Sequence, residues 1–204
     1  MAEVFERIDD RLRAFIEAQR MFFVATAPSG DGGHINLSPK GGEGLFRVTG
    51  PHGFAYVDLM GSGIETIAHL KENGRIVVMF CAFEGAPKIV RLHGVGRPVE
   101  QHDEGFEELL ATFDVSPEQL AAVRSVVSVE VERVGDSCGF VVPRMDYVGE
   151  RDQLYRFADN RLRKIGPEAV KEYVTANNAE SIDGLAGLEP LVDVAAGSVG
   201  RRKL

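Results

Sequence analysis

The chain has 204 residues, 44% of them hydrophobic and 26% charged, which is ordinary for a globular protein with one domain or one domain and an added lobe. Its formal net charge of −8 argues against a nucleic-acid-binding protein, because contacts with phosphates need clustered basic residues, and only the tail Arg201-Arg202-Lys203 is such a cluster. Two cysteines cannot form a disulfide framework, and no apolar stretch approaches the length of a membrane span, so we expect a reduced, cytoplasmic protein without membrane contact.

The first quarter of the chain predicts one helix followed by short strands. Between residues 3 and 19, apolar residues recur at helical spacing among charged ones, which indicates an amphipathic helix. Strand-like runs follow, separated by glycine- and proline-rich turns, over residues 21–27, 34–39, 45–48 and 54–57.

Residues 58–83 combine a glycine turn, a helix and a strand. The turn Gly61-Ser62-Gly63 precedes a helix with one apolar stripe, and Asn73-Gly74 ends that helix before a strand at 76–83. A helix N-terminus at the end of a strand suits a phosphate, because its backbone N–H groups are unpaired. The spacing of Ser62 and Glu65 is also that of a capping box, which predicts a plain capped helix instead.

The rest of the chain adds two strands and then becomes helical. We expect strands at 88–97 and 125–134, with helices at 103–113 and from Ser116-Pro117 onward. About six strands with little helix between them favour an antiparallel barrel over a doubly wound parallel sheet. Helical patterns dominate from residue 149, so we divide the chain into a barrel domain (1–148) and a C-terminal helical extension and tail (149–204).

Several polar residues are candidate ligands. Asn36 and Ser38 share one face of the predicted strand 34–39 and Lys40 follows, so they could offer hydrogen bonds to a ribityl chain or a phosphate, or form a solvated strand face. Arg91, in a strand rich in valine and leucine, is either an anion ligand or a surface arginine.

Three other sequence patterns do not indicate a functional site. The turn at 61–63 is no dinucleotide fingerprint, because Thr66 stands where the third glycine belongs. Residues 135–139 match G-x-S-x-G, but the extended run after them cannot provide the helix of a nucleophile elbow, so we interpret them as a structural turn. The five histidines have no metal-ligand spacing, and we expect no metal site.

The order of segments MFFVATA, HINLSPKGG, FAYVDLMGSGIETIAHLKENGRIVVMF and KIVRLHGVGRPV, over residues 5–134, resembles the pyridoxamine 5′-phosphate oxidase-like family of FMN-binding split barrels. The segments SCGFVVPRMDYVGERDQL and NNAESIDGLAG are similar to a bacterial branch that carries only the general name of oxidase. The resemblance implies a six-stranded split β-barrel with peripheral helices, and a homodimer with FMN at its interface. It also implies a set of cofactor-binding residues: Asn36, Ser38, Lys40, Ser62, Thr66 and Arg91.

This sequence departs from the true pyridoxamine phosphate oxidases at three places. Ile64-Glu65-Thr66 replaces their Ser-Arg-Lys run, Ile35 replaces an arginine, and their C-terminal Arg-x-His segment is not found. These departures argue against pyridoxamine phosphate as the substrate. We therefore expect an FMN-dependent oxidoreductase acting on another small molecule, with no catalytic residue assigned. The alternatives are a non-catalytic flavin- or tetrapyrrole-binding protein and a deazaflavin (F420)-dependent reductase.

Overall fold

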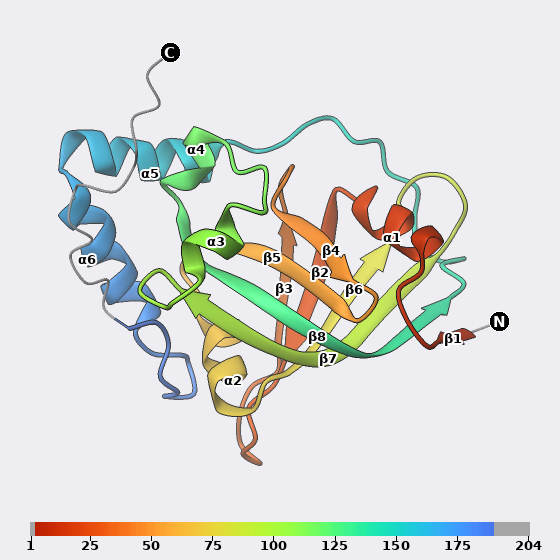
Figure 1. Ribbon diagram of the computed structural model, residues 1–204. Coiled ribbons are helices and arrows are strands. Elements are labelled where there is room, and N and C mark those ends of the chain that lie inside the picture. The colour runs from red at the N-terminus through yellow and green to blue at the C-terminus, as the bar shows by residue number, and fades with distance from the viewer. Residues whose placement is uncertain (1–2, 190–204) are drawn as a thin grey trace.

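A computed structural model describes residues 3–189, so the basic tail 201–203 lies outside the described residues. The chain forms a curled antiparallel sheet with helices around it (Figure 1). The strands are β1 (Glu3–Phe5), β2 (Met21–Thr26), β3 (Asn36–Gly41), β4 (Phe46–Gly50), β5 (Gly53–Leu59), β6 (Arg75–Cys81), β7 (Ile89–Glu100) and β8 (Val123–Ser137). The helices are α1 (Asp10–Glu17), α2 (Glu65–Asn73), α3 (Phe106–Leu110), α4 (Pro117–Leu120), α5 (Gln153–Lys164) and α6 (Pro167–Asn178).

The sheet runs in the order β3-β2-β6-β7-β8-β5-β4, with β1 added on β8. Its antiparallel pairing and peripheral helices confirm the predicted fold class. The predicted number of strands was wrong: the described chain has eight instead of six.

The start predicted for the first helix was also wrong. Residues 3–5 pair with β8, and the helix begins only after Asp9. The Asp9 carboxylate accepts a hydrogen bond from the Leu12 backbone N–H (2.7 Å), which defines that start.

The core fills the concave side of the sheet, where alternate strand residues point inward. At its centre Phe22 contacts the rings of four other aromatic residues, with centroid distances of 5.0–5.5 Å to Phe46, Phe54, Tyr56 and Phe80. A second apolar cluster lies under α3 and contains Leu45, Val57 and Phe113. Both clusters border the site described below.

Strand β3 is an edge of the sheet, and its register decides which of its side chains face inward. Lys40 pairs with Phe22, Ser38 with Val24 and Asn36 with Thr26. Because directly paired residues share a face, the three polar side chains of β3 point toward the core side. Leu37 points the other way and is 64% exposed.

The C-terminal helices contribute side chains to the main core. After β8 the chain crosses over the molecule to α5, and α6 follows beside it (Figure 1). Buried residues of this part, Ala158, Val174 and Leu188, belong to the same core cluster as Phe22. The structure confirms the helical pattern predicted from residue 149, with α5 and α6 as its two helices. The division into two domains at residue 148 stays a prediction. Among the helices between residues 3 and 189, none has the length and apolarity needed to cross a membrane.

Candidate functional site

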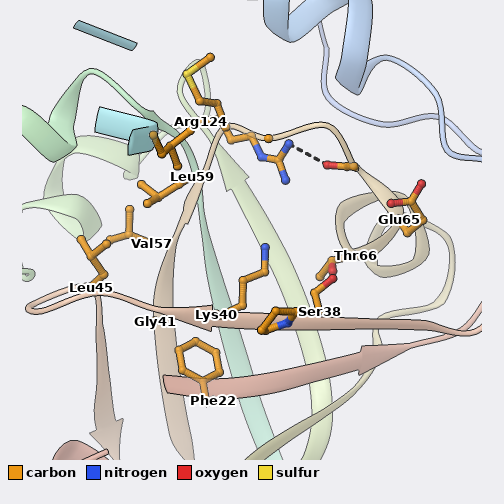
Figure 2. Close-up of a pocket in the computed structure, with 15 residues that line it drawn as sticks. Phe22, Ser38, Lys40, Gly41, Leu45, Val57, Leu59, Glu65, Thr66 and Arg124 are labelled. Atoms are coloured by element: carbon orange, nitrogen blue, oxygen red, sulfur yellow. Dashed lines mark hydrogen bonds between the residues drawn. The ribbon is translucent and has the colours of Figure 1, made fainter. Parts of the chain in front are cut away.

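A cavity of about 330 Å³ opens between β3, the end of β5 and the start of α2. Figure 2 shows its lining, in which Lys40 extends from β3 toward Arg124, while Ser38 and Thr66 lie close to each other. The polar lining residues are Ser38, Lys40, Glu65, Thr66 and Arg124, and the apolar ones are Phe22, Pro39, Leu45, Val57, Leu59, Met60 and Leu154. The cavity therefore joins a charged wall to an apolar one.

The charged wall is an ion-pair cluster around Asp58. Its carboxylate receives Lys40 Nζ at 2.7 Å and Arg124 Nε at 2.6 Å. Asp58 and Arg124 are almost fully buried (0% and 4% exposed side chains), whereas Lys40 is 20% exposed. Burial alone would raise the pKa of Asp58, but the charges of Arg124 and Lys40 outweigh it and lower that pKa from 3.8 to about 2. Two cations and one carboxylate give this cluster one net positive charge, and the carboxylate of Glu65, which also lines the cavity, adds one negative charge.

Arg124 lines the cavity and pairs with Asp58, but the sequence did not predict it as a site residue. Its Nη1 donates to the carbonyl oxygen of Gly63 (2.9 Å), so it connects β8 to the turn before α2. Neither this bond nor the ion pair uses the remaining terminal nitrogen of the guanidinium. The available signal was an arginine in the apolar run AAVRSVV, just before the predicted strand.

The start of α2 differs from the predicted capping box. The helix begins at Glu65 with Ile64 as N-cap, and Ser62 makes no capping bond, so that prediction was wrong. Glu65 instead folds back, and its Oε2 accepts from the Ile64 N–H at 3.0 Å. Glu65 is thus at the first helical position rather than the third, which a Ser62 cap would need. Ser62 is exposed and does not line the cavity, whereas Thr66 is buried and does.

Asn36 and Ser38 belong to a hydrogen-bonded group at the cavity wall. Asn36 Nδ2 donates to Thr66 Oγ1 (2.9 Å) and to Thr26 Oγ1 (3.1 Å). Ser38 Oγ donates to Asn36 Oδ1 (3.0 Å). Four of the six predicted site residues, Asn36, Ser38, Lys40 and Thr66, are therefore brought together at one wall.

Arg91 is not brought to this wall. Its neighbours Val90 and Leu92 both point into the core, so the Arg91 side chain lies on the outer face of the sheet. There its Nη1 donates to Ser137 Oγ at 3.1 Å. Ser137 is the last residue of β8, and residues 135–137 pair with β7, so the interpretation of 135–139 as a turn was wrong for these three residues. No helix follows Ser137 directly, as expected.

The C-terminal extension holds the turn that borders the cavity. Asn178, at the end of α6, is fully buried and donates from Nδ2 to the carbonyl oxygen of Gly61 (2.9 Å). Gly187 packs so tightly against Asn178 that an added Cβ would lie 2.2 Å from the Asn178 carbonyl oxygen. Leu154 of α5 lines the cavity itself. The extension is therefore part of the wall rather than a separate appendage.

Comparison with known proteins gives the family. The family model described as pyridoxamine 5′-phosphate oxidase matches residues 8–138, which include β2 to β8. The chain belongs to the pyridoxamine 5′-phosphate oxidase family. The pyridoxamine 5′-phosphate oxidase family protein ustO of Aspergillus flavus is 38% identical over 197 residues, covering 90% of this chain and 77% of that protein. This confirms the resemblance found in the sequence, and because the match to ustO extends over most of the chain, the relationship reaches beyond the barrel strands.

Solved structures similar to this member of the pyridoxamine 5′-phosphate oxidase family include an FMN-binding protein from Syntrophomonas wolfei. The two are 16% identical with a TM-score of 0.46, and the match covers 60% of this chain and 80% of that chain. The FAD-binding protein from Mycobacterium smegmatis is 12% identical with a TM-score of 0.42, covering 65% and 97% of the two chains.

The lowered pKa of Asp58 predicts an acid-sensitive contribution to stability. A carboxylate whose folded-state pKa (about 2) is below its ordinary value (3.8) stabilises the fold above about pH 4, and this contribution disappears as the pH falls toward about 2. Its size is about 2 kcal/mol. We expect the difference in unfolding free energy between the native protein and Asp58→Asn to shrink by that amount between about pH 5 and about pH 2. If the difference in unfolding free energy stays constant between about pH 5 and about pH 2, the pKa of Asp58 is not lowered in the folded protein.

Proposed function

We propose that the cavity binds FMN and that the protein is a flavin-dependent oxidoreductase acting on a small molecule. The observation that carries the proposal is the pair of cations at the cavity wall, which keep donors to spare. Lys40 uses one of its three N–H donors on Asp58, and Arg124 has a terminal nitrogen outside its two described bonds. Such donors suit a phosphate group. Because the chain belongs to this family, FMN is the phosphate-containing ligand that we expect.

The chemical types of the lining residues fit FMN. Lys40 and Arg124 would hold the phosphate, Thr66 and Ser38 would hydrogen-bond it or the ribityl chain, and the apolar wall at Leu45 and Leu59 would exclude water. When bound, the flavin supplies the redox chemistry, and the protein orients it and controls access. Glu65 is an unfavourable neighbour, because its carboxylate accepts from the N–H of the N-cap residue Ile64, at the helix start where a phosphate would otherwise bind.

The proposal is tested first by the absorption spectrum of the purified protein and by titration with FMN and riboflavin. Lys40→Met should weaken FMN binding by roughly 10- to 100-fold, because a hydrogen bond to a charged group contributes about 1.5–3 kcal/mol. Riboflavin, which lacks the phosphate, should bind both proteins equally.

Lys164→Met, at an exposed position of α5, is the matched control and should leave FMN affinity unchanged. A native protein that neither carries flavin nor is thermally stabilised by FMN would contradict the proposal. Bound FMN that no nicotinamide or substrate reduces would show a binding protein instead of an enzyme.

We further propose that a second copy of the chain covers the outer face of the sheet near β3. Apolar side chains line this face: Phe23 and Ala25 of β2 pair with Met79 and Val77 of β6 and are only half-buried. Beside them Ile35 and Leu37 are 81% and 64% exposed. A face of this kind usually marks a contact surface. Arg91 stands on the same outer face, so its predicted contact with the cofactor requires the second copy.

Light scattering is expected to give twice the mass of one chain. Leu37→Glu should shift the protein toward single chains, because it places a charge in the covered apolar face. Leu120→Glu, at a 47% exposed position on α4, is the control and should leave the mass unchanged. A native protein with the mass of one chain would overturn this proposal.

A further inference from the structure

A series of buried and partly buried hydrogen bonds leads from α2 to the cavity. It begins at His69, which is fully buried and whose Nδ1 lies 3.0 Å from Thr26 Oγ1. Asn36 Nδ2 donates to that same oxygen and also to Thr66 Oγ1, and Asn36 Oδ1 accepts from Ser38. Two of its five members, Ser38 and Thr66, line the cavity, and the other three, Asn36, Thr26 and His69, lie behind them.

Each hydroxyl in this series of hydrogen bonds has one proton, so a hydroxyl that accepts from Asn36 keeps its own proton for another acceptor. Asn36 gives one N–H to Thr26 and the other to Thr66, which leaves both hydroxyl protons unused in those two bonds. For Thr26 the remaining partner is His69 Nδ1, and this nitrogen can accept only when the ring proton is on Nε2. For Thr66 the remaining proton is available to the cavity.

The hydrogen bonds could also all run in the opposite direction, but the donor and acceptor roles of Thr66 and Ser38 at the cavity wall would then be exchanged. With the Asn36 amide turned over, Thr26 and Thr66 would both donate to its oxygen, and His69 would donate from Nδ1. Thr66 would then have no proton to offer, and Ser38 would point its proton into the cavity. The cations Lys40 and Arg124 in the same wall attract an anion, which needs donors, and this favours the first direction.

We propose that His69 and Thr26 are positioning residues that hold Asn36 in one orientation, so that Thr66 is a hydrogen-bond donor and Ser38 an acceptor toward the ligand. The wall then selects a ligand with an anionic oxygen beside Thr66 and a hydroxyl group beside Ser38. This inference rests on the proposed function and makes it more specific, because a phosphorylated polyol chain has both groups.

The position of the proton on His69 tests the direction without any ligand. Long-range ¹H–¹⁵N spectra of histidine-labelled protein distinguish the two ring tautomers. We expect His69 to carry its proton on Nε2, which has no hydrogen-bond partner among residues 3–189. A proton on Nδ1 would overturn the proposal. This result does not depend on whether the protein binds FMN, so it separates failure of the hydrogen-bond chain from failure of the proposed function.

Thr26 variants test the effect on binding. Thr26→Val keeps the shape but removes the hydroxyl, so Asn36 loses its link to His69; we expect FMN affinity to fall roughly fivefold to tenfold. Thr26→Ser restores the hydroxyl and should bind FMN like the native protein, with His69 again protonated on Nε2. A merely structural role would lower thermal stability in Thr26→Val without changing the tautomer or the affinity. Native affinity in a folded Thr26→Val protein would therefore overturn the proposal even if FMN binds.

Discussion

Arg124→Met is expected to destabilise the protein by about 3–5 kcal/mol, because it removes one partner of a buried ion pair and leaves a buried charge. Among residues 3–189, Lys40 would then be the one cation left beside Asp58, although the Asp58 side chain is fully buried. The turn before α2 would also lose the bond from Arg124 to the Gly63 carbonyl oxygen. Urea unfolding of the native and variant proteins at neutral pH measures the difference.

Two comparison variants make this prediction specific to the buried pair. Arg163→Met removes an ion pair with Asp159, but the Arg163 side chain is 78% exposed, so its loss should cost less than about 1 kcal/mol. The double variant Asp58→Asn, Arg124→Met removes both buried charges and should recover part of the loss seen in Arg124→Met alone. A single variant as stable as the native protein would mean that the ion pair does not contribute to folding.

Local patterns in the sequence predicted the elements whose ends are determined locally. Ser116 Oγ accepts from the Gln119 N–H, and Gln119 Oε1 accepts from the Ser116 N–H, so Ser116 is the N-cap that the Ser-Pro start of α4 predicts. Gly74 ends α2 with a φ of 71°, the left-handed conformation that the Asn-Gly pair predicts. The capping box at Ser62 failed because the chain before α2 is held by distant residues, Arg124 and Asn178, rather than by its own turn.

The charged wall could not be derived from spacing, because it depends on strand pairing. Asp58 pairs with Ser125 across β5 and β8, and this register brings Arg124 to a carboxylate 66 residues earlier in the chain. Lys40 comes from a third strand. Periodicity in the sequence shows which face a side chain takes, but not which strand lies beside it. This is why the polar face of β3 was predicted and its buried counter-ion was not.

The same limit explains the extra strand at the N-terminus. Residues 3–5 continue the apolar spacing of α1 closely enough to predict helix, yet they pair with β8 near its end. A strand of three residues has no period of its own, so only its distant partner defines it.

Phe22→Ala is expected to cost about 3–5 kcal/mol, because it empties the centre of the aromatic core. Phe22 is 1% exposed and its ring lies within 5.0–5.5 Å of four other ring centroids. The matched control is Phe157→Ala on α5, where the ring is 38% exposed and pairs with Tyr173 alone among the aromatic rings of the described chain. We expect that variant to cost about 1 kcal/mol. Thermal or urea unfolding measures both.

The Phe22 variant also tests whether the cavity and the core are one packing unit. Phe22 lines the cavity directly beneath Lys40, with which it pairs across β2 and β3. Phe22→Leu keeps most of the apolar volume and should lose less stability than Phe22→Ala, but it changes the surface beneath the Lys40 side chain. We therefore expect weaker FMN binding in Phe22→Leu and native binding in Phe157→Ala. Equal stability losses in Phe22→Ala and Phe157→Ala would show that the barrel core is not organised around Phe22, and the cavity would then owe its shape to the charged wall alone.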